Sequence, residues 1–160
     1  MVAEFLRESN AIEAEYSDLA FKDATKAWEY AWEDRNDMNV SHVLDTHKIL
    51  MCNINPQVAG RFRVCDVWVG CDRRRFVSED CFRHGVQDIL EQMCPNYKAK
   101  SIPEVHVRDV HVRFEKLHPF EDGNGRVGRI LYNIHRTNIG LPIHVICSGD
   151  DQLDYYRWFD

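Results

Sequence analysis

The chain has 160 residues, the length of one domain, and 44% of them are hydrophobic, which is enough to build a core. Its 20 basic and 26 acidic residues give a net charge of −6, which argues against a nucleic-acid backbone as the partner. No apolar run approaches the ~20 residues of a membrane span, and the first residues are partly acidic, unlike a signal peptide. We therefore expect a single cytoplasmic domain over residues 1–160 that contacts neither nucleic acid nor membrane.

Two helices are predicted in the first third of the chain. Apolar side chains recur at helical spacing over residues 9–34, which predicts one long helix capped by Ser9 or Asn10. A second helix is expected from Ser41 to Met51. Its inward face would be formed by Val43, Leu44, His47 and Leu50.

A hairpin and a third helix are predicted in the middle of the chain. Residues 64–77 place β-branched and aromatic side chains on both sides of a Gly-Cys-Asp turn, a pattern typical of a short β-hairpin. Ser78 then caps a helix that Pro95 ends. The buried stripe of this helix is expected to be Phe82, Val86, Ile89, Leu90 and Met93.

The last third predicts two more helices with a loop between them. Residues 101–104 (Ser-Ile-Pro-Glu) resemble a capping box with an early proline, and they open a helix with Val107, Val110, Phe114 and Leu117 inward. Residues 118–125 contain a proline and two glycines, so they form a loop. The next helix turns Val127, Ile130, Leu131 and Ile134 inward and stops before Gly140 and Pro142. The predicted class is mainly α.

The loop before the last of these helices gathers residue types that bind phosphate. At residues 123–125 (Gly-Asn-Gly), two glycines let backbone N–H groups converge on an anion, and the helix N-terminus adds its positive end. Arg126 and Arg129 are spaced to reach the same anion. Asp122 is a carboxylate suited to Mg²⁺ beside phosphates, and His118 is a base near neutral pH. The pattern predicts phosphoryl or nucleotidyl transfer; the alternative is an ordinary turn with solvated charges.

The segment H-P-F-E-D-G-N-G-R-V-G-R at residues 118–129 resembles, position for position, the signature H-x-F-x-[DE]-G-N-G-R-x-x-R of the Fic domain family. A looser similarity extends to residues 130–142 after the motif and to residues 60–70, which resemble the approach to the family's hairpin flap. The resemblance implies a Fic fold, a helical bundle with one short β-hairpin flap beside the active-site loop. Fic enzymes typically move AMP from ATP to a protein hydroxyl and release pyrophosphate.

The resemblance implies the catalytic roles. His118 is the general base that takes the proton from a Tyr, Thr or Ser hydroxyl of the target. Asp122 holds Mg²⁺ between the α- and β-phosphates, and Phe120 anchors the loop on the core. Gly125 favours AMP transfer over phosphate transfer, because the kinase-like Doc branch carries a lysine at this place.

The resemblance also implies how the nucleotide is bound. Arg126 grips the phosphate chain, and Arg129 reaches the γ-phosphate. The phosphates are further neutralised by the backbone N–H groups of Gly123, Asn124 and Gly125.

The hairpin is implied to lie beside this site as a flap for the target protein. An extended target segment would pair with its edge, so that main-chain hydrogen bonds place the hydroxyl. The flap residues are then Val67, Trp68, Val69 and Gly70. The alternative is a hairpin that covers the core.

Residues 9–13 (Ser-Asn-Ala-Ile-Glu) resemble the inhibitory S/T-x-x-x-E element of self-restrained Fic proteins, in which a glutamate pairs with the second motif arginine in place of the γ-phosphate. Here Ser9 opens the element and Glu13 would pair with Arg129. Ala14 departs from the element, where Gly or Asn is usual. The first 60 residues hold 11 acidic and 5 basic side chains, which agrees with an acidic helix over a basic site. The alternative is a surface glutamate.

The sequence therefore predicts a protein adenylyltransferase that uses ATP and Mg²⁺, modifies a hydroxyl of a protein substrate or of itself, and is inhibited by Glu13. Two alternatives stay open. A related enzyme on the same scaffold would transfer another phosphate-linked group or remove AMP, with Glu13 positioning a water. A non-catalytic regulator would only bind nucleotide or a partner, although the intact His118 argues against it.

Overall fold

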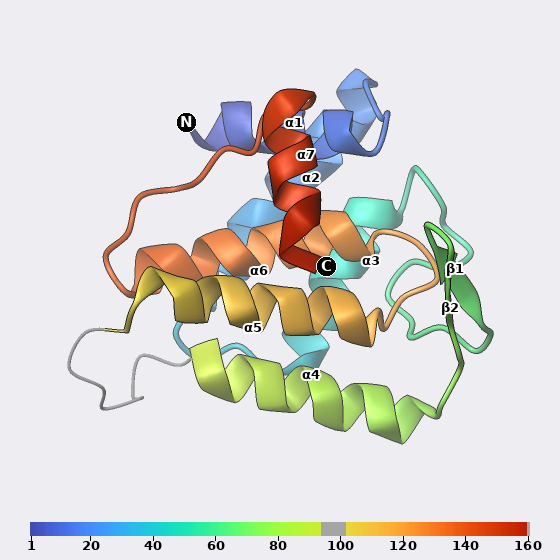
Figure 1. The fold of residues 1–160 in the computed structure, drawn as a ribbon. Helices are drawn as coiled ribbons and strands as arrows, with labels where there is room; N and C mark the ends of the chain where they lie inside the picture. Colours follow the sequence, from blue (N-terminus) through green and yellow to red (C-terminus); the bar gives the residue numbers. More distant parts are fainter. Residues whose placement is uncertain (94–101, 160) are drawn as a thin grey trace.

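The computed structural model describes residues 1–93 and 102–159, and these form a helical molecule with one small sheet (Figure 1). Within these ranges no helix combines the length and hydropathy needed to cross a membrane. The mainly α class with one hairpin is confirmed. The elements in chain order are α1 (Val2–Ile12), α2 (Asp18–Glu33), α3 (Val40–Met51), β1 (Val67–Val69), β2 (Asp72–Arg74), α4 (Glu79–Met93), α5 (Glu104–Leu117), α6 (Asn124–Asn138), α7 (Asp150–Tyr156) and the 3₁₀ helix η1 (Arg157–Phe159).

Helix α6 is the central element of the fold. Every residue from Arg126 to Arg136 is buried, because α5 packs along one side of the helix and α1, α2 and α3 cover others. Figure 1 shows α4, α5 and α6 side by side, with α1 and α7 on the side of α6 away from α4. All six helices from α1 through α6 contribute to one hydrophobic core, for example with Phe5, Trp28, Leu50, Phe82, Phe114 and Ile130.

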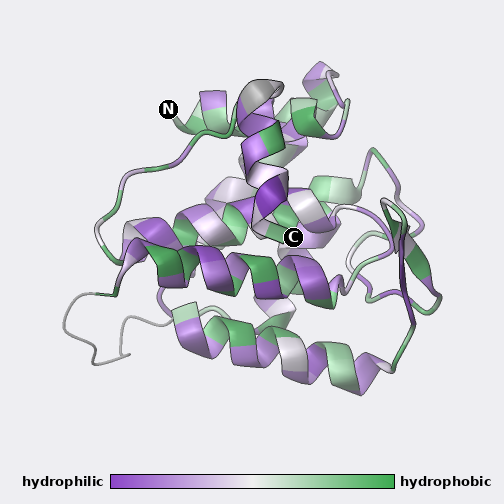
Figure 2. Ribbon diagram, in the orientation of Figure 1, coloured by the Kyte–Doolittle hydropathy of each residue, from purple (hydrophilic) through white to green (hydrophobic). Residues whose placement is uncertain are grey.

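Helices α4 and α5 are amphipathic, as their spacing predicts. Figure 2 shows hydrophobic segments alternating with hydrophilic ones along both helices. The predicted stripe of α4 is buried from Phe82 to Met93, and in α5 only Leu117 of the predicted inner face is half-buried rather than buried. Pro95 and Ser101 lie outside the described residues. The residue before α5 is Pro103, whose side chain makes no capping hydrogen bond.

The single helix predicted over residues 9–34 is wrong, because the chain breaks it into α1 and α2. The backbone turns at Ala14, which has a left-handed φ of +55°. Ser17 then caps α2 by accepting a hydrogen bond at Oγ from the N–H of Ala20 (3.1 Å). Ser9 and Asn10 are not caps but buried residues inside α1. The apolar spacing predicted a continuous buried face through this region, but Tyr16 and Leu19, two of the residues that made up the pattern, are exposed.

Helix α3 confirms the second predicted helix. It begins at Val40 because the side chain of Asn39 accepts hydrogen bonds from the N–H groups of Ser41 and His42 (2.9 and 3.3 Å). Three of its four predicted inward residues are buried, and Leu44 is half-buried.

The hairpin is present but shorter than the predicted 64–77. Strands β1 and β2 are antiparallel, with Val67 opposite Arg74 and Val69 opposite Asp72, and Gly70 turns the chain with φ +58°. Trp68 is 68% exposed and Val69 37% exposed, so the hairpin does not cover the core with these side chains. The alternative of a core-covering hairpin is therefore wrong.

Candidate active site

A cavity of about 220 Å³ opens where the loop between α5 and α6 meets α1, the hairpin and the C-terminal helices. Its wall combines charged groups from several elements with aromatic side chains of α7 and η1. The residues that line it are Glu13, Val69, Arg74, Glu115, Lys116, His118, Gly125, Arg129, Tyr155, Tyr156 and Phe159. Residues from both ends of the chain thus share one cavity with the loop that the sequence singled out.

His118 ends α5 and points its ring into this cavity as a neutral base. Its backbone is left-handed (φ +48°), and its N–H donates to the carbonyl of Phe114. The ring Nδ1 lies 3.2 Å from the carbonyl of Glu115, which accepts a hydrogen bond from Nδ1–H, so that Nε2 of the neutral ring carries no proton. Burial lowers the pKa of His118, and the guanidinium groups of Arg63 and Arg74 lower it further.

The loop after His118 is fixed from both sides. Phe120 is fully buried and stacks on the ring of His47, with centroids 3.8 Å apart. The amide side chain of Asn124 donates to the carbonyl of Phe120 (2.8 Å) and accepts from its N–H (2.9 Å). Burial lowers the pKa of His47 to about 4, so the ring is neutral, and its Nε2 donates to the carbonyl of Asp122 (3.0 Å). Phe120 is therefore the anchor that the sequence predicted.

Helix α6 begins two residues earlier than predicted, at Asn124, with Gly123 (φ +81°) as its N-cap. The N–H groups of the first turn have no partner within the helix, which makes this end an anion site. The N–H of Gly123 donates to Oδ1 of Asp122 (2.6 Å). Arg126 is buried and reaches Oδ1 of Asp122 with Nη2 (3.3 Å). Within the described residues, its Nε and Nη1 are buried without a hydrogen-bond partner.

Arg129 is also buried and is held by the end of α1. Its Nε donates to Oγ of Ser9 (2.9 Å), and its Nη2 donates to the carbonyl of Ser9 (2.9 Å) and to Oε1 of Glu13 (2.7 Å). A Cβ on Gly125 would lie 2.5 Å from this carboxylate oxygen. A side chain at this position would have to displace the end of Glu13 or of Arg129, so Gly125 leaves room for the carboxylate over the start of α6.

Asp122 is the one predicted metal ligand. Its side chain is 43% exposed, and the two hydrogen bonds to Oδ1 leave the carboxylate open to solvent on one side. Across the described residues, no three His, Cys, Asp or Glu side chains come together as a metal site. Mg²⁺ commonly binds through one carboxylate together with substrate phosphates and water. This donor set fits Mg²⁺ in the company of a nucleotide and not as a resident metal.

The structure brings only part of the predicted flap to the cavity. Val69 lines it, whereas Val67, Trp68 and Gly70 do not. Arg63 connects the hairpin with the motif loop: its Nε donates to the carbonyl of His118 (2.7 Å), and its guanidinium also donates to the carbonyls of Cys65 and Arg75. Sequence reasoning assigned no role to Arg63, although a positive charge between apolar residues is a signal for a buried hydrogen-bonding side chain.

Sequence reasoning also missed a group of polar side chains behind the cavity. His111 is buried, and its Nδ1 donates to the carbonyl of Gly128 (3.1 Å), while its Nε2 accepts from the hydroxyl of Tyr155 (2.9 Å). Burial lowers the pKa of His111 to about 3, so the ring is neutral. Glu115 stands beside it in the cavity wall. Both residues occupy the face of α5 that carries Phe114 and His118, which is the pattern that could have revealed them.

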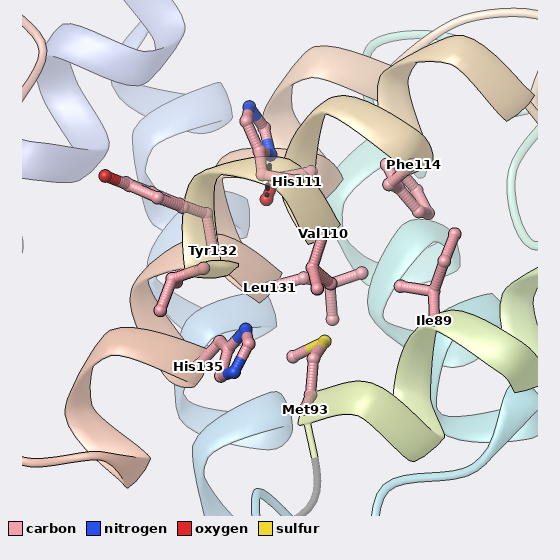
Figure 3. Close-up of a pocket in the computed structure, with 10 residues that line it drawn as sticks. Ile89, Met93, Val110, His111, Phe114, Leu131, Tyr132 and His135 are labelled. Atoms are coloured by element: carbon pink, nitrogen blue, oxygen red, sulfur yellow. Dashed lines mark hydrogen bonds between the residues drawn. The ribbon is translucent and has the colours of Figure 1, made fainter. Parts of the chain in front are cut away.

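A second cavity, between α4, α5 and α6, is not a candidate site. Figure 3 shows it enclosed by Val110, Leu131, Met93 and other side chains, with His111 at its edge. Its volume of about 10 Å³ has room for no more than a single water.

Relatives of known name match most of this chain. The sequence model of the Fic/DOC family matches residues 37–135, more than half of the chain. Protein adenylyltransferase fic-1 of Caenorhabditis elegans is 28% identical over 124 residues, which cover 78% of this chain and 24% of that protein. Protein adenylyltransferase Fic of Nematostella vectensis is 27% identical over 130 residues, which cover 77% of this chain and 28% of that protein. The chain thus spans about a quarter of the length of these curated relatives.

Solved structures share the fold. A Fic domain containing signaling protein from Bacteroides thetaiotaomicron gives a TM-score of 0.77 at 20% identity, over 97% of this chain and 69% of that chain. Fic-1 from C. elegans (aa134–508) gives a TM-score of 0.73 at 19% identity, over 97% of this chain and 53% of that chain. The family match includes the whole motif at residues 118–129, and the chain belongs to the Fic/DOC family.

Proposed function

We propose that this chain is the catalytic part of a protein adenylyltransferase, which transfers AMP from ATP to a Tyr, Thr or Ser hydroxyl of a protein and releases pyrophosphate. The relatives named protein adenylyltransferase support this activity. The observation that carries it is one cavity that a neutral histidine shares with Gly125 and Arg129 of α6, next to Arg126, whose buried Nε and Nη1 have no partner among the described residues. A base opposite an anion site is what transfer from a phosphate to a hydroxyl requires.

His118 and the start of α6 divide the chemistry between them. The target hydroxyl gives its proton to Nε2 of His118 while its oxygen forms a bond to the α-phosphorus. The bond from the α-phosphorus to the bridging oxygen breaks, and pyrophosphate leaves with that oxygen. The N–H groups of Asn124 and Gly125, with the guanidinium of Arg126, stabilise the charge that develops on the phosphates.

Asp122 would hold Mg²⁺ together with the phosphates, and the ion would supply positive charge to the departing pyrophosphate. Its exposed carboxylate beside Arg126 supports this role.

The edge of β1 would pair with an extended target segment, and Val69 in the cavity wall supports a target placed at that edge.

Glu13 would inhibit the enzyme by occupying the place of the γ-phosphate on Arg129. The ion pair of 2.7 Å, together with the two hydrogen bonds to Ser9, supports this role. A carboxylate and a γ-phosphate compete for the same guanidinium, so ATP would bind in a different pose while Glu13 stays in place.

The test is labelling of proteins in a lysate with ATP that carries the label on the α-phosphate. We expect Glu13→Gly to label protein strongly, the original chain to label weakly, and Glu13→Gly with His118→Ala to label nothing. Glu4→Gly is the matched control, because Glu4 is an exposed glutamate on the same helix. Labelling that survives the loss of His118 would remove this residue from the base role.

The alternatives give different results in the same assay. Transfer of label from the γ-phosphate would indicate phosphate transfer. Release of AMP from a modified protein would indicate AMP removal. Nucleotide binding by Glu13→Gly without any labelling, of itself or of other proteins, would indicate a regulator.

A further inference from the structure

Glu115 places a second, unpaired carboxyl group in the wall of the nucleotide cavity. It lies in the last turn of α5, and its side chain is only 12% exposed. Its Oε1 is buried and, among the described residues, has no hydrogen-bond partner. The proposed mechanism gives this group no task, so its position needs its own explanation.

The surroundings of Glu115 hold the carboxyl group in place without neutralising it. A Cβ on Gly128 would lie 2.1 Å from Oε1, so the glycine on α6 makes room for the carboxyl group. The nearest base, Nε2 of His111, is 4.0 Å away. Burial lowers the pKa of this ring to about 3, so the ring is neutral and brings no positive charge.

Two carboxyl groups face a single guanidinium group. Arg129 on α6 bonds Glu13 at 2.7 Å, and Glu115 lines the same cavity, close enough for the charges of both to act on it. Burial raises the pKa of Glu115 to about 7; the charge of Glu13 also raises it, and the charge of Arg129 lowers it. The other titratable and charged groups around the cavity are Arg74 of the hairpin, Lys116 and His118 next to Glu115, and Tyr155 and Tyr156 of α7.

A terminal phosphate bound to Arg129 would keep the pKa of Glu115 raised or raise it further. The phosphate would replace the negative charge of Glu13 with at least as much negative charge near the same place. Because the side chain of Glu115 is mostly buried, a carboxylate there would repel the phosphate with little screening, whereas a carboxylic acid would not. The acid also has an O–H that can donate to a phosphate oxygen.

We propose that Glu115 acts as a carboxylic acid that admits the triphosphate, so that binding of a nucleotide with a terminal phosphate takes up one proton from solvent onto the Glu115 carboxylate. This inference rests on the proposed function. It makes Glu115 a specificity-determining residue that favours ATP over AMP as the solution becomes more acidic.

The test is calorimetry of Mg²⁺ with an ATP analogue that has a non-hydrolysable α,β bridge, in buffers of different ionisation enthalpy. With Glu13→Gly we expect net proton uptake, and an affinity that falls above pH 7 by up to about tenfold per pH unit. With Glu13→Gly plus Glu115→Gln we expect no such uptake and, at about pH 8.5, tighter binding than with Glu13→Gly alone. Glu29→Gln in the Glu13→Gly background is the matched control on an exposed glutamate.

Three results would overturn the inference. Equal pH dependence in both variants would show that Glu115 does not carry the proton. Weaker binding by the Glu115→Gln variant at every pH would show a packing role. Equal proton uptake when Glu13→Gly binds AMP and when it binds the triphosphate would show that the uptake does not depend on the terminal phosphate. If neither variant bound nucleotide at any pH, the proposed function itself would fail, and this inference with it.

Discussion

The two motif arginines are in opposite states in this structure. Arg129 donates from Nε and Nη2 to Ser9 and Glu13, whereas Arg126 keeps Nε and Nη1 buried without a partner among the described residues. A buried donor on a charged group without a partner costs roughly 1–3 kcal/mol. Arg126 therefore favours an anion at the start of α6 even while Arg129 is held by Glu13. Under the proposed function, ATP binds to the chain in one step and reaches the pose for AMP transfer in another, when Glu13 moves.

The neutral state of His118 predicts how transfer depends on pH. Burial and two nearby arginines lower the pKa of its imidazole, and a general base works in its deprotonated form. At saturating ATP, we expect transfer by Glu13→Gly to rise with pH and to reach its plateau from a midpoint below pH ~6.5, the ordinary pKa of histidine. A pH–rate profile of the α-label assay measures this. A midpoint above that value, or an unchanged profile in His118→Asn, would contradict the assignment.

At the scale of elements, the end of α1 decides where Glu13 points. Ala14 takes a left-handed φ of +55° directly after Glu13, a conformation that costs an alanine roughly 1 kcal/mol. We expect Ala14→Gly to raise the free energy of unfolding by several tenths of a kcal/mol, because glycine adopts this φ without strain. Ala11→Gly, inside α1, is the matched control and is expected to lower the free energy of unfolding by about 1 kcal/mol. Thermal unfolding measures both, and equal signs for the two changes would contradict the argument.

The same element shows what the sequence could and could not predict. The motif at residues 118–129 and the partnership of Glu13 with Arg129 could be predicted, because a local pattern and a short element carry them. The break between α1 and α2 could not, because Ala14 is a helix-forming residue and nothing local demands a positive φ. For Arg63 and Glu115 the sequence offers only a position, between apolar residues for Arg63 and on the helix face of Phe114 and His118 for Glu115, since their roles come from contacts that only the tertiary fold creates.

At the scale of the molecule, helix α1, which carries Glu13 at its end, is part of the core. Phe5 and Leu6 of α1 are 2% and 1% exposed and belong to the same hydrophobic cluster as Trp28 and Phe114. Burying two such side chains contributes about 3–6 kcal/mol, which is a large part of the ~5–15 kcal/mol that stabilises a typical domain. We therefore expect relief of the proposed inhibition to require a movement at Glu13 and not the departure of α1.

Two variants test whether α1 is a fixed part of the core: one that lacks residues 1–14, and one in which only Glu13 is substituted. We expect the truncated chain to lose several kcal/mol of stability, so that it melts far below the original chain or unfolds without cooperativity. Glu13→Gly changes one partly exposed side chain at the end of the helix and is expected to melt close to the original chain. Circular dichroism during heating measures both. A truncated chain that kept the original melting temperature would show that α1 is a detachable cover, and inhibition would then work by release of the whole helix.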